Sequence, residues 1–211
     1  MAFVLLAFFA SQHTRFPGDL AASRHLQSIH TAPFELALDG PEAMASTIGS
    51  TIAAVLILAV LWTIHQRRQI ILVSAIPLGA SLDSAIKRIV ARPRPSPNLI
   101  DVRQHLSDPS FPSGHTTAGM LIFGLVWYLA GLLIVRRALR LAVQASCVVA
   151  IACTGLARVY DGVHWLSDVY GGVILGALVL RASMLVQQQL FTTAPSEPGR
   201  IREVDSGGDT H

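Results

Sequence analysis

Charged side chains are scarce in this chain. Asp, Glu, Lys and Arg make up 14% of its 211 residues, whereas soluble domains carry about 25%. Hydrophobic residues reach 52% of the chain and are gathered in long blocks rather than in amphipathic repeats. The composition therefore argues against a soluble domain and indicates a membrane protein.

Cysteine is scarce as well, and no metal-binding pattern accompanies it. The two cysteines, Cys147 and Cys153, stand six residues apart in one apolar block, where a helix would turn them in different directions. They are interpreted as small core residues, so neither a disulfide nor a cysteine metal pair is expected. The histidines lack carboxylates at ligand spacing, and we therefore expect neither a metal nor a cofactor.

Apolar stretches long enough to cross a bilayer as helices occur at five places. They cover residues 46–64, 69–86, 117–135, 141–157 and 166–186. A further apolar run at residues 1–10 would reach only about 15 Å as a helix, half the hydrocarbon thickness. It lacks the preceding basic segment of a signal peptide, so we expect a truncated first span. The predicted fold class is all-α: a polytopic transmembrane helix bundle with five full spans plus a short first one.

Composition divides the chain into three regions. Residues 1–45 combine the short apolar run with a polar, interfacial segment, in which helices are expected to break at Pro17, Gly18, Pro33, Gly40 and Pro41. Only a short amphipathic piece is expected there, around residues 20–29. Residues 46–186 form the transmembrane core. Residues 187–211, rich in Pro, Gly, Ser and mixed charge, are predicted to be a disordered cytoplasmic tail.

Basic residues in short connections predict the orientation in the membrane. Residues 66–69 and 136–140 are basic and contain no acidic residue, so they are predicted to face the cytoplasm. Residues 11–45, 90–116 and 158–165 then share the opposite face, which is periplasmic in a bacterial inner membrane. The arginines form no stripe interleaved with aromatic residues, so no nucleic-acid partner is expected.

That outer face is basic too, at Lys87, Arg92 and Arg94, so these charges need an explanation other than topology. Ionisable residues at span ends are costly unless they are paired or hydrated, and by default they mark a functional site.

The sequence FPSGHTT at residues 111–117 opens directly into an apolar span. Ser113 favours a helix N-cap, and Gly114 allows another group to approach the backbone closely. The free amides at a helix start attract anions, and His115 adds a group that can move a proton near neutral pH. Taken alone, the stretch fits an anion pocket or a capped helix start with a surface histidine.

Two further clusters lie at the same predicted face: Lys87 with Arg94, and Arg158 with His164 and Asp168. His164 and Asp168 are four residues apart at a helix start, so they share a helix face. A carboxylate on one imidazole nitrogen fixes the tautomer and leaves the other nitrogen free as a nucleophile. The three cations suit an anion with several oxygens, most simply a phosphoryl group.

Each of these residues also has a plain structural explanation. Lys87 can pair with Asp83 one helical turn earlier, and Arg158 can interact with helix carbonyls. The histidine and the carboxylate at 164 and 168 can form a structural pair. Their occurrence together at one membrane face, beside a phosphate-type helix start, favours a single functional site.

These motifs, in this order, resemble the three signatures of the type 2 phosphatidic acid phosphatase superfamily, which is shared with vanadium haloperoxidases and bacterial acid phosphatases. The first is K-x6-RP, from Lys87 to Pro95; the second is PSGH at residues 112–115; the third is R-x5-H-x3-D, from Arg158 to Asp168. The resemblance covers residues 87–172. It departs from the family at Ala157, where a serine is usual.

The resemblance implies a metal-independent integral-membrane phosphatase acting on lipid phosphomonoesters or diphosphates of the phosphatidate, phosphatidylglycerophosphate or undecaprenyl diphosphate type. His164 would attack phosphorus to form a phosphohistidine, Asp168 would orient His164, and His115 would protonate the leaving group. The phosphate would be held by Lys87, Arg94, Ser113, Gly114, His115 and Arg158. The implied partners are the lipid substrate and the bilayer, with the active site at the outer interface.

Two functions of other classes stay open at this point. A membrane anion transporter predicts ionisable residues deep within several spans, and apart from Asp83, near the end of a span, the sequence has none. A non-catalytic lipid-phosphate binder would not need His115, His164 and Asp168 all intact. The sequence leaves the choice of lipid and the oligomeric state undecided.

Overall fold

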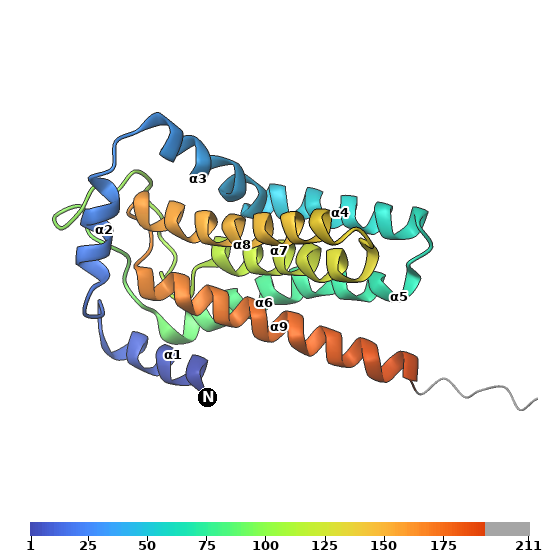
Figure 1. Cartoon of the computed structure of the whole chain (residues 1–211). Helices are drawn as coiled ribbons and strands as arrows, with labels where there is room; N and C mark the ends of the chain where they lie inside the picture. The colour runs from blue at the N-terminus through green and yellow to red at the C-terminus, as the bar shows by residue number, and fades with distance from the viewer. Residues whose placement is uncertain (193–211) are drawn as a thin grey trace, which may run out of the picture.

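The computed structural model describes residues 1–192, and the regular secondary structure in this part of the chain is all helical (Figure 1). The helices are α1 (Ala2–Gln12), α2 (Asp19–Gln27), α3 (Ala32–Ala45), α4 (Thr47–Thr63), α5 (Arg67–Ile70), the 3₁₀ helix η1 (Ile71–Ser74), α6 (Ala75–Val90), α7 (Gly114–Leu133), α8 (Arg137–Tyr160) and α9 (Leu166–Thr192). The long helices run roughly along one direction and form a bundle. The all-α prediction is confirmed for the described residues.

Within the described residues, four continuous helical stretches are long and apolar enough to cross a membrane. They are Arg67–Val90, which joins α5, η1 and α6, and the helices α7, α8 and α9. Helices α3 and α4 pass the same test only as a pair, bent by 68° at the break between them. The structure thus provides four spans, or five if the bent pair counts as one, where the sequence predicted five full spans. Helix α1 has 11 residues and is too short to span, as predicted.

Apolar side chains dominate the outer surface of the bundle. On α4, the side chains that are more than half exposed include Ile48, Ile52, Val55, Leu56 and Trp62. Contiguous apolar surface of this kind is unstable in water but stable against lipid chains. The chain is therefore an integral membrane protein.

Helix α7 lies at the centre, packed against α6, α8 and α9. Its residues Leu121, Ile122 and Leu125 are almost fully buried in the main core cluster. Helix α9 approaches α7 closely because Gly172 has no side chain; a Cβ there would lie 2.6 Å from the Ser113 carbonyl oxygen. This close packing brings the first turns of α7 and α9 side by side, although they are about 50 residues apart in the chain.

Of the predicted helix breakers in residues 11–45, Pro17 and Gly18 lie between α1 and α2, but the other three do not interrupt a helix. Helix α3 runs through both Gly40 and Pro41, and Pro33 lies in its first turn. Proline is tolerated at a helix start because the amide there has no intrahelical partner. The expectation of an irregular polar segment was therefore wrong for residues 32–45.

Tertiary packing explains why α3 forms. Its inner face buries Leu38 against Ala157 and Tyr160 near the end of α8, and the ring of Phe34 meets Tyr160 edge to face at 5.6 Å. Burial of such apolar groups stabilises a helix that local propensity alone would not favour.

Helix α9 continues beyond its predicted end at residue 186 and reaches Thr192. Gln187 is buried and donates a hydrogen bond of 2.8 Å to the Arg68 carbonyl oxygen, which fastens this end of α9 to α5. Residues 187–192 are therefore helical rather than disordered. The rest of the predicted tail, residues 193–211, lies outside the described residues.

The connections predicted to share one face do gather at one end of the bundle (Figure 1). Gln27 of α2 donates hydrogen bonds to the carbonyl oxygens of Asp101 and Tyr160, at 2.7 Å and 2.8 Å. The Arg103 amide donates to the Asp161 carbonyl oxygen at 3.0 Å. Residues 11–45, 90–116 and 158–165 thus form one cap, and the basic turns lie at the opposite end.

Candidate active site

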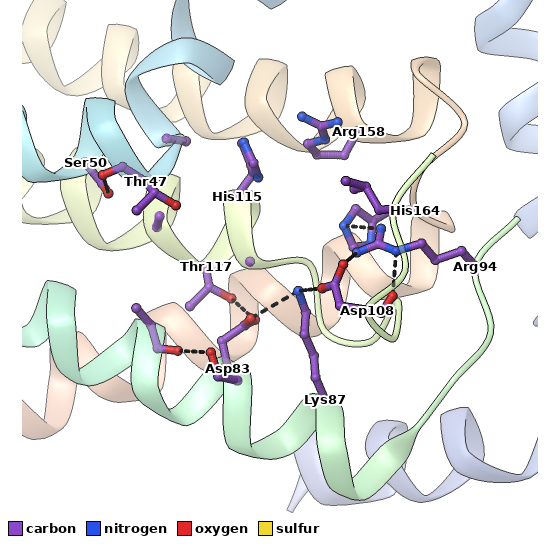
Figure 2. A pocket seen from close by; sticks show the side chains of 16 residues that line it. Thr47, Ser50, Asp83, Lys87, Arg94, Asp108, His115, Thr117, Arg158 and His164 are labelled. Carbon is purple, nitrogen blue, oxygen red and sulfur yellow. Dashed lines mark hydrogen bonds and ion pairs between the residues drawn. The ribbon is translucent and has the colours of Figure 1, made fainter. Parts of the chain in front are cut away.

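A cavity of about 350 Å³ opens beneath this cap (Figure 2). Its walls come from the junction of α3 and α4, from α6, from the first turn of α7, from the end of α8, from the connection between α8 and α9 and from the loop at residues 91–113. Six of the eight predicted site residues line it: Lys87, Arg94, Gly114, His115, Arg158 and His164. The other two, Ser113 and Asp168, are fully buried and are absent from the lining as described.

The start of α7 forms the floor of the cavity. Ser113 occupies the N-cap position, but its hydroxyl accepts a hydrogen bond from Thr116 Oγ1 at 3.0 Å and caps no amide within the described chain. The first-turn amides therefore stay available to an anion. A Cβ on Gly114 would lie 3.1 Å from Asp83 Oδ2 and 3.6 Å from Lys87 Nζ, so the glycine makes room for these two side chains.

His164 lies between a carboxylate and a guanidinium. Its Nδ1 is 3.5 Å from Asp168 Oδ2, and its Nε2 is 3.2 Å from Arg94 Nη1 on the cavity side. Asp168 Oδ2 also accepts a hydrogen bond of 2.9 Å from the Trp165 amide, which holds the carboxylate in place. Nδ1 thus faces the carboxylate, whereas Nε2 is on the cavity side, in contact with Arg94.

Burial sets the charge of this imidazole. It lowers the pKa of His164 to about 4, and the favourable interaction with Asp168 offsets only part of that effect. At neutral pH the ring is therefore uncharged, and Nε2 keeps the lone pair that a nucleophile needs.

Carboxylates outside the predicted motifs form ion pairs with the cationic side chains that line the cavity. Asp108, on the loop before α7, accepts hydrogen bonds from Lys87 Nζ at 2.9 Å and from Arg94 Nη2 at 2.8 Å (Figure 2). Partial burial opposes ionisation of this carboxyl, but the two cations outweigh it and lower its pKa to about 2. Asp108 thus takes up donors that an incoming oxyanion would use.

Arg158 likewise interacts with two carboxylates. Its side chain is buried, forms an ion pair with Glu42 of α3, and lies 3.4 Å from Asp161. Lys87 also lies 3.4 Å from Asp83, so the structural pairing considered for this lysine exists alongside its place in the cavity. No spacing rule could have found Glu42 and Asp108, because they are 116 and 14 residues from the arginines they contact.

The sequence analysis grouped Arg92 with Lys87 and Arg94 as basic residues of the outer face, but the Arg92 side chain lies elsewhere in the structure. It does not line the described cavity but is buried behind it, bonded to Asp168 and to Asp19 of α2. The sequence feature that sets Arg92 apart is the repeated Arg-Pro pair at residues 92–95, whose prolines favour an extended chain after α6.

The assembled groups fit one kind of ligand. Three cations and the free amides of a helix start can hold a tetrahedral oxyanion, and two imidazoles in the same cavity can attack it and move a proton. In residues 1–192, no group of three or more His, Cys, Asp or Glu side chains is placed to hold a metal ion.

Comparison with known families identifies the class to which this fold and cavity belong. The model of the PAP2 superfamily matches residues 68–191, a range that contains every predicted site residue. The chain belongs to the PAP2 superfamily.

Individual relatives make the relationship more specific. A protein of Escherichia coli (strain K12) named "Putative undecaprenyl-diphosphatase YbjG" is 29% identical over 137 residues, which cover 62% of this chain and 63% of that protein's length. The transmembrane PAP2 type phosphatidylglycerolphosphate phosphatase from Bacillus subtilis has a similar fold, with a TM-score of 0.75, 20% identity, and coverage of 90% of this chain and 96% of the other. LpxE of Aquifex aeolicus gives a TM-score of 0.62 and 22% identity, with coverage of 81% and 96%.

Proposed function

We propose that this protein is an integral-membrane phosphatase that hydrolyses lipid phosphomonoesters or diphosphates through a phosphohistidine intermediate, without a metal ion. The observation that carries this proposal is the placement of His164, with Nδ1 facing Asp168 and Nε2 beside Arg94 at the cavity. His115, Lys87 and Arg158 line the same cavity.

The reaction has two steps, each of which uses a histidine. The phosphoryl group binds among the cations and the first-turn amides of α7, and Nε2 of His164 attacks phosphorus. The bond between phosphorus and the lipid oxygen breaks, and His115 gives that oxygen a proton. A water molecule then attacks the phosphohistidine while His115 takes its proton. Inorganic phosphate leaves, and both histidines return to their starting states.

The membrane setting supports a lipid substrate. The cavity lies at the end of the spanning helices, so a head group can enter it while the chains stay in the bilayer. The names of the relatives point to undecaprenyl diphosphate and phosphatidylglycerophosphate, and phosphatidate presents the same group. The basic turns at residues 66–69 and 136–140 favour a cavity that opens to the periplasm of a bacterial inner membrane, with the C-terminal tail in the cytoplasm.

A panel assay tests this function directly. The purified protein is expected to release inorganic phosphate from phosphatidate, phosphatidylglycerophosphate or undecaprenyl diphosphate in mixed micelles, at the same rate with and without excess EDTA. The cations and amides of the cavity supply the charge stabilisation that a metal would otherwise give. No release from any substrate, or release abolished by the chelator and restored by a divalent cation, would contradict the proposal.

The carboxylate of Asp108 supplies a prediction on substrate affinity. Asp108→Asn is expected to lower KM about two- to fivefold with kcat little changed, because a half-exposed ion pair that substrate must displace is worth about 1 kcal/mol or less. Inhibition by inorganic phosphate is expected to strengthen by the same factor. Steady-state kinetics with phosphate as a competitive inhibitor measure both effects.

Asp101→Asn is the matched control, since Asp101 lies on the same loop with an exposed carboxylate outside the described cavity. A higher KM in Asp108→Asn would show that Asp108 helps to bind substrate instead of competing with it.

The alternative of an anion transporter has less support. The cavity between α4, α7 and α8, about 280 Å³ in volume, is lined entirely by apolar residues. An anion pathway through the bundle would need polar groups along its length. Turnover in detergent, where there is no membrane gradient, distinguishes the two functions.

A further inference from the structure

Arg92 is a charged residue with no access to solvent, and it occupies a variable position of the first motif. Helix α6 ends just before Ala91, whose left-handed backbone (φ 50°) turns the chain away from the helix axis. The Arg92 side chain that follows is 0% exposed. Since burial of a cation is costly unless it is paired, its partners show what holds it there.

The Arg92 guanidinium joins two buried carboxylates. Nη1 donates to Asp168 Oδ1 at 2.5 Å and to Ser167 Oγ at 2.8 Å, and Nη2 donates to Asp19 Oδ2 at 3.0 Å. On the other side the guanidinium lies 5.0 Å from the centre of the Phe16 ring. The planar fork of arginine can bridge the two carboxylates in this way, and the single ammonium of lysine cannot.

Asp19 in turn anchors the first turn of α9. Its Oδ1 accepts a hydrogen bond of 3.0 Å from the Ser167 amide, and its Oδ2 accepts one of 2.7 Å from Ser167 Oγ. The Phe16 amide donates to the same carboxylate at 2.8 Å. A carboxylate from α2 thus serves as a remote cap for the helix turn that carries Asp168.

The two carboxylate oxygens of Asp168 contact different partners. Oδ1 is taken by Arg92, whereas Oδ2 accepts from the Trp165 amide and faces His164 Nδ1. On the far side of His164, Arg94 lies at 3.2 Å, and the other charged or titratable groups of the cavity include Lys87, Asp108, His115 and Arg158. Within the described part of the chain, Arg92 is therefore the cation that contacts the Asp168 carboxylate directly.

We propose that Arg92 is a positioning residue for the phosphatase reaction, acting on His164 through Asp168 and anchored by Asp19. This inference rests on the proposed function. Arg92 fixes the carboxylate so that Oδ2 meets Nδ1–H and the Nε2 lone pair points at phosphorus. It also balances the buried negative charge, which would otherwise draw a proton onto the imidazole and remove the nucleophile.

The test uses Arg92→Gln combined with Asp19→Asn, because Arg92→Gln alone would leave two buried carboxylates without a cation and destabilise the fold. The double variant keeps the net charge of the buried cluster, but the remaining negative charge is on Asp168, beside His164, and has lost its guanidinium. We expect kcat on a lipid phosphate to fall about 10- to 100-fold with KM changed less than about threefold. The acid limb of the kcat/KM profile is expected to move up by about one pH unit or more.

Arg92→Lys is the second variant, since it keeps the charge but reaches only one carboxylate. Its kcat is expected to lie between those of the wild type and the double variant, with the acid limb unmoved. Arg15→Gln is the matched control and should behave as the wild type, because Arg15 is an exposed arginine in the connection between α1 and α2. Size-exclusion chromatography and circular dichroism give the folded fraction by which each kcat is divided.

A double variant with wild-type kcat and pH profile would overturn the inference. So would a loss of kcat accompanied by an unmoved acid limb in the double variant, which indicates a structural role only. If the wild-type protein itself fails to hydrolyse every lipid phosphate, the proposed function fails instead, and the two failures are therefore distinguished.

Discussion

Replacing His164 with alanine is expected to lower kcat on a lipid phosphate by about 10⁴-fold or more, the size of effect found when a catalytic nucleophile is removed. The imidazole is the group that would form the bond to phosphorus, and the remaining cations can bind phosphate but cannot replace it. Phosphate release under saturating substrate measures the loss. KM is expected to change little, because Lys87, Arg94 and Arg158 stay in the cavity.

A second measurement on the same variant examines the intermediate. Brief reaction of the wild type with ³²P-labelled substrate, followed by denaturation in alkali, is expected to leave label on the protein that is lost in acid, as a phosphoramidate is. His164→Ala is expected to carry no such label. The control is His25→Ala, which removes an exposed imidazole from α2 and should keep full activity. Full phosphatase activity in His164→Ala would end the proposed mechanism.

His115→Ala is expected to show an effect that depends on the leaving group. With phosphatidate, whose leaving alkoxide is strongly basic, loss of the general acid should cost about 10²–10⁴-fold in kcat. With p-nitrophenyl phosphate or a diphosphate, the leaving oxygen carries its charge well and needs little help. For these substrates the loss is expected to be at least about tenfold smaller.

Comparing the substrates separates two roles that the cavity geometry allows for His115. A group that only holds the phosphoryl oxygens would lower activity on all substrates by the same factor. Equal losses on phosphatidate and on p-nitrophenyl phosphate would therefore contradict the general-acid role. The assays are run above and below pH 7, so that a changed protonation state is not mistaken for a lost group.

Much of the membrane architecture follows from local sequence. Long apolar stretches predict spanning helices because lipid leaves backbone groups no partners outside the helix. The start of α7 was predicted from Ser113, a residue type that favours the N-cap position, and Ser113 does occupy that position. The same local rules failed at α3, where Gly40 and Pro41 indicated a break but packing on Tyr160 supports a helix.

The residue types for an anion site were likewise evident from spacing within each motif, because short-range spacing fixes which side chains share a helix face. The sequence by itself therefore determined a helical membrane protein and the groups that gather at one end of it. Only the tertiary structure decided how those groups are paired. Arg92 meets Asp168 and Asp108 joins Lys87 to Arg94 because separate helices and a loop pack together. Ion pairs between distant segments depend on that packing, and no pattern along the chain encodes them.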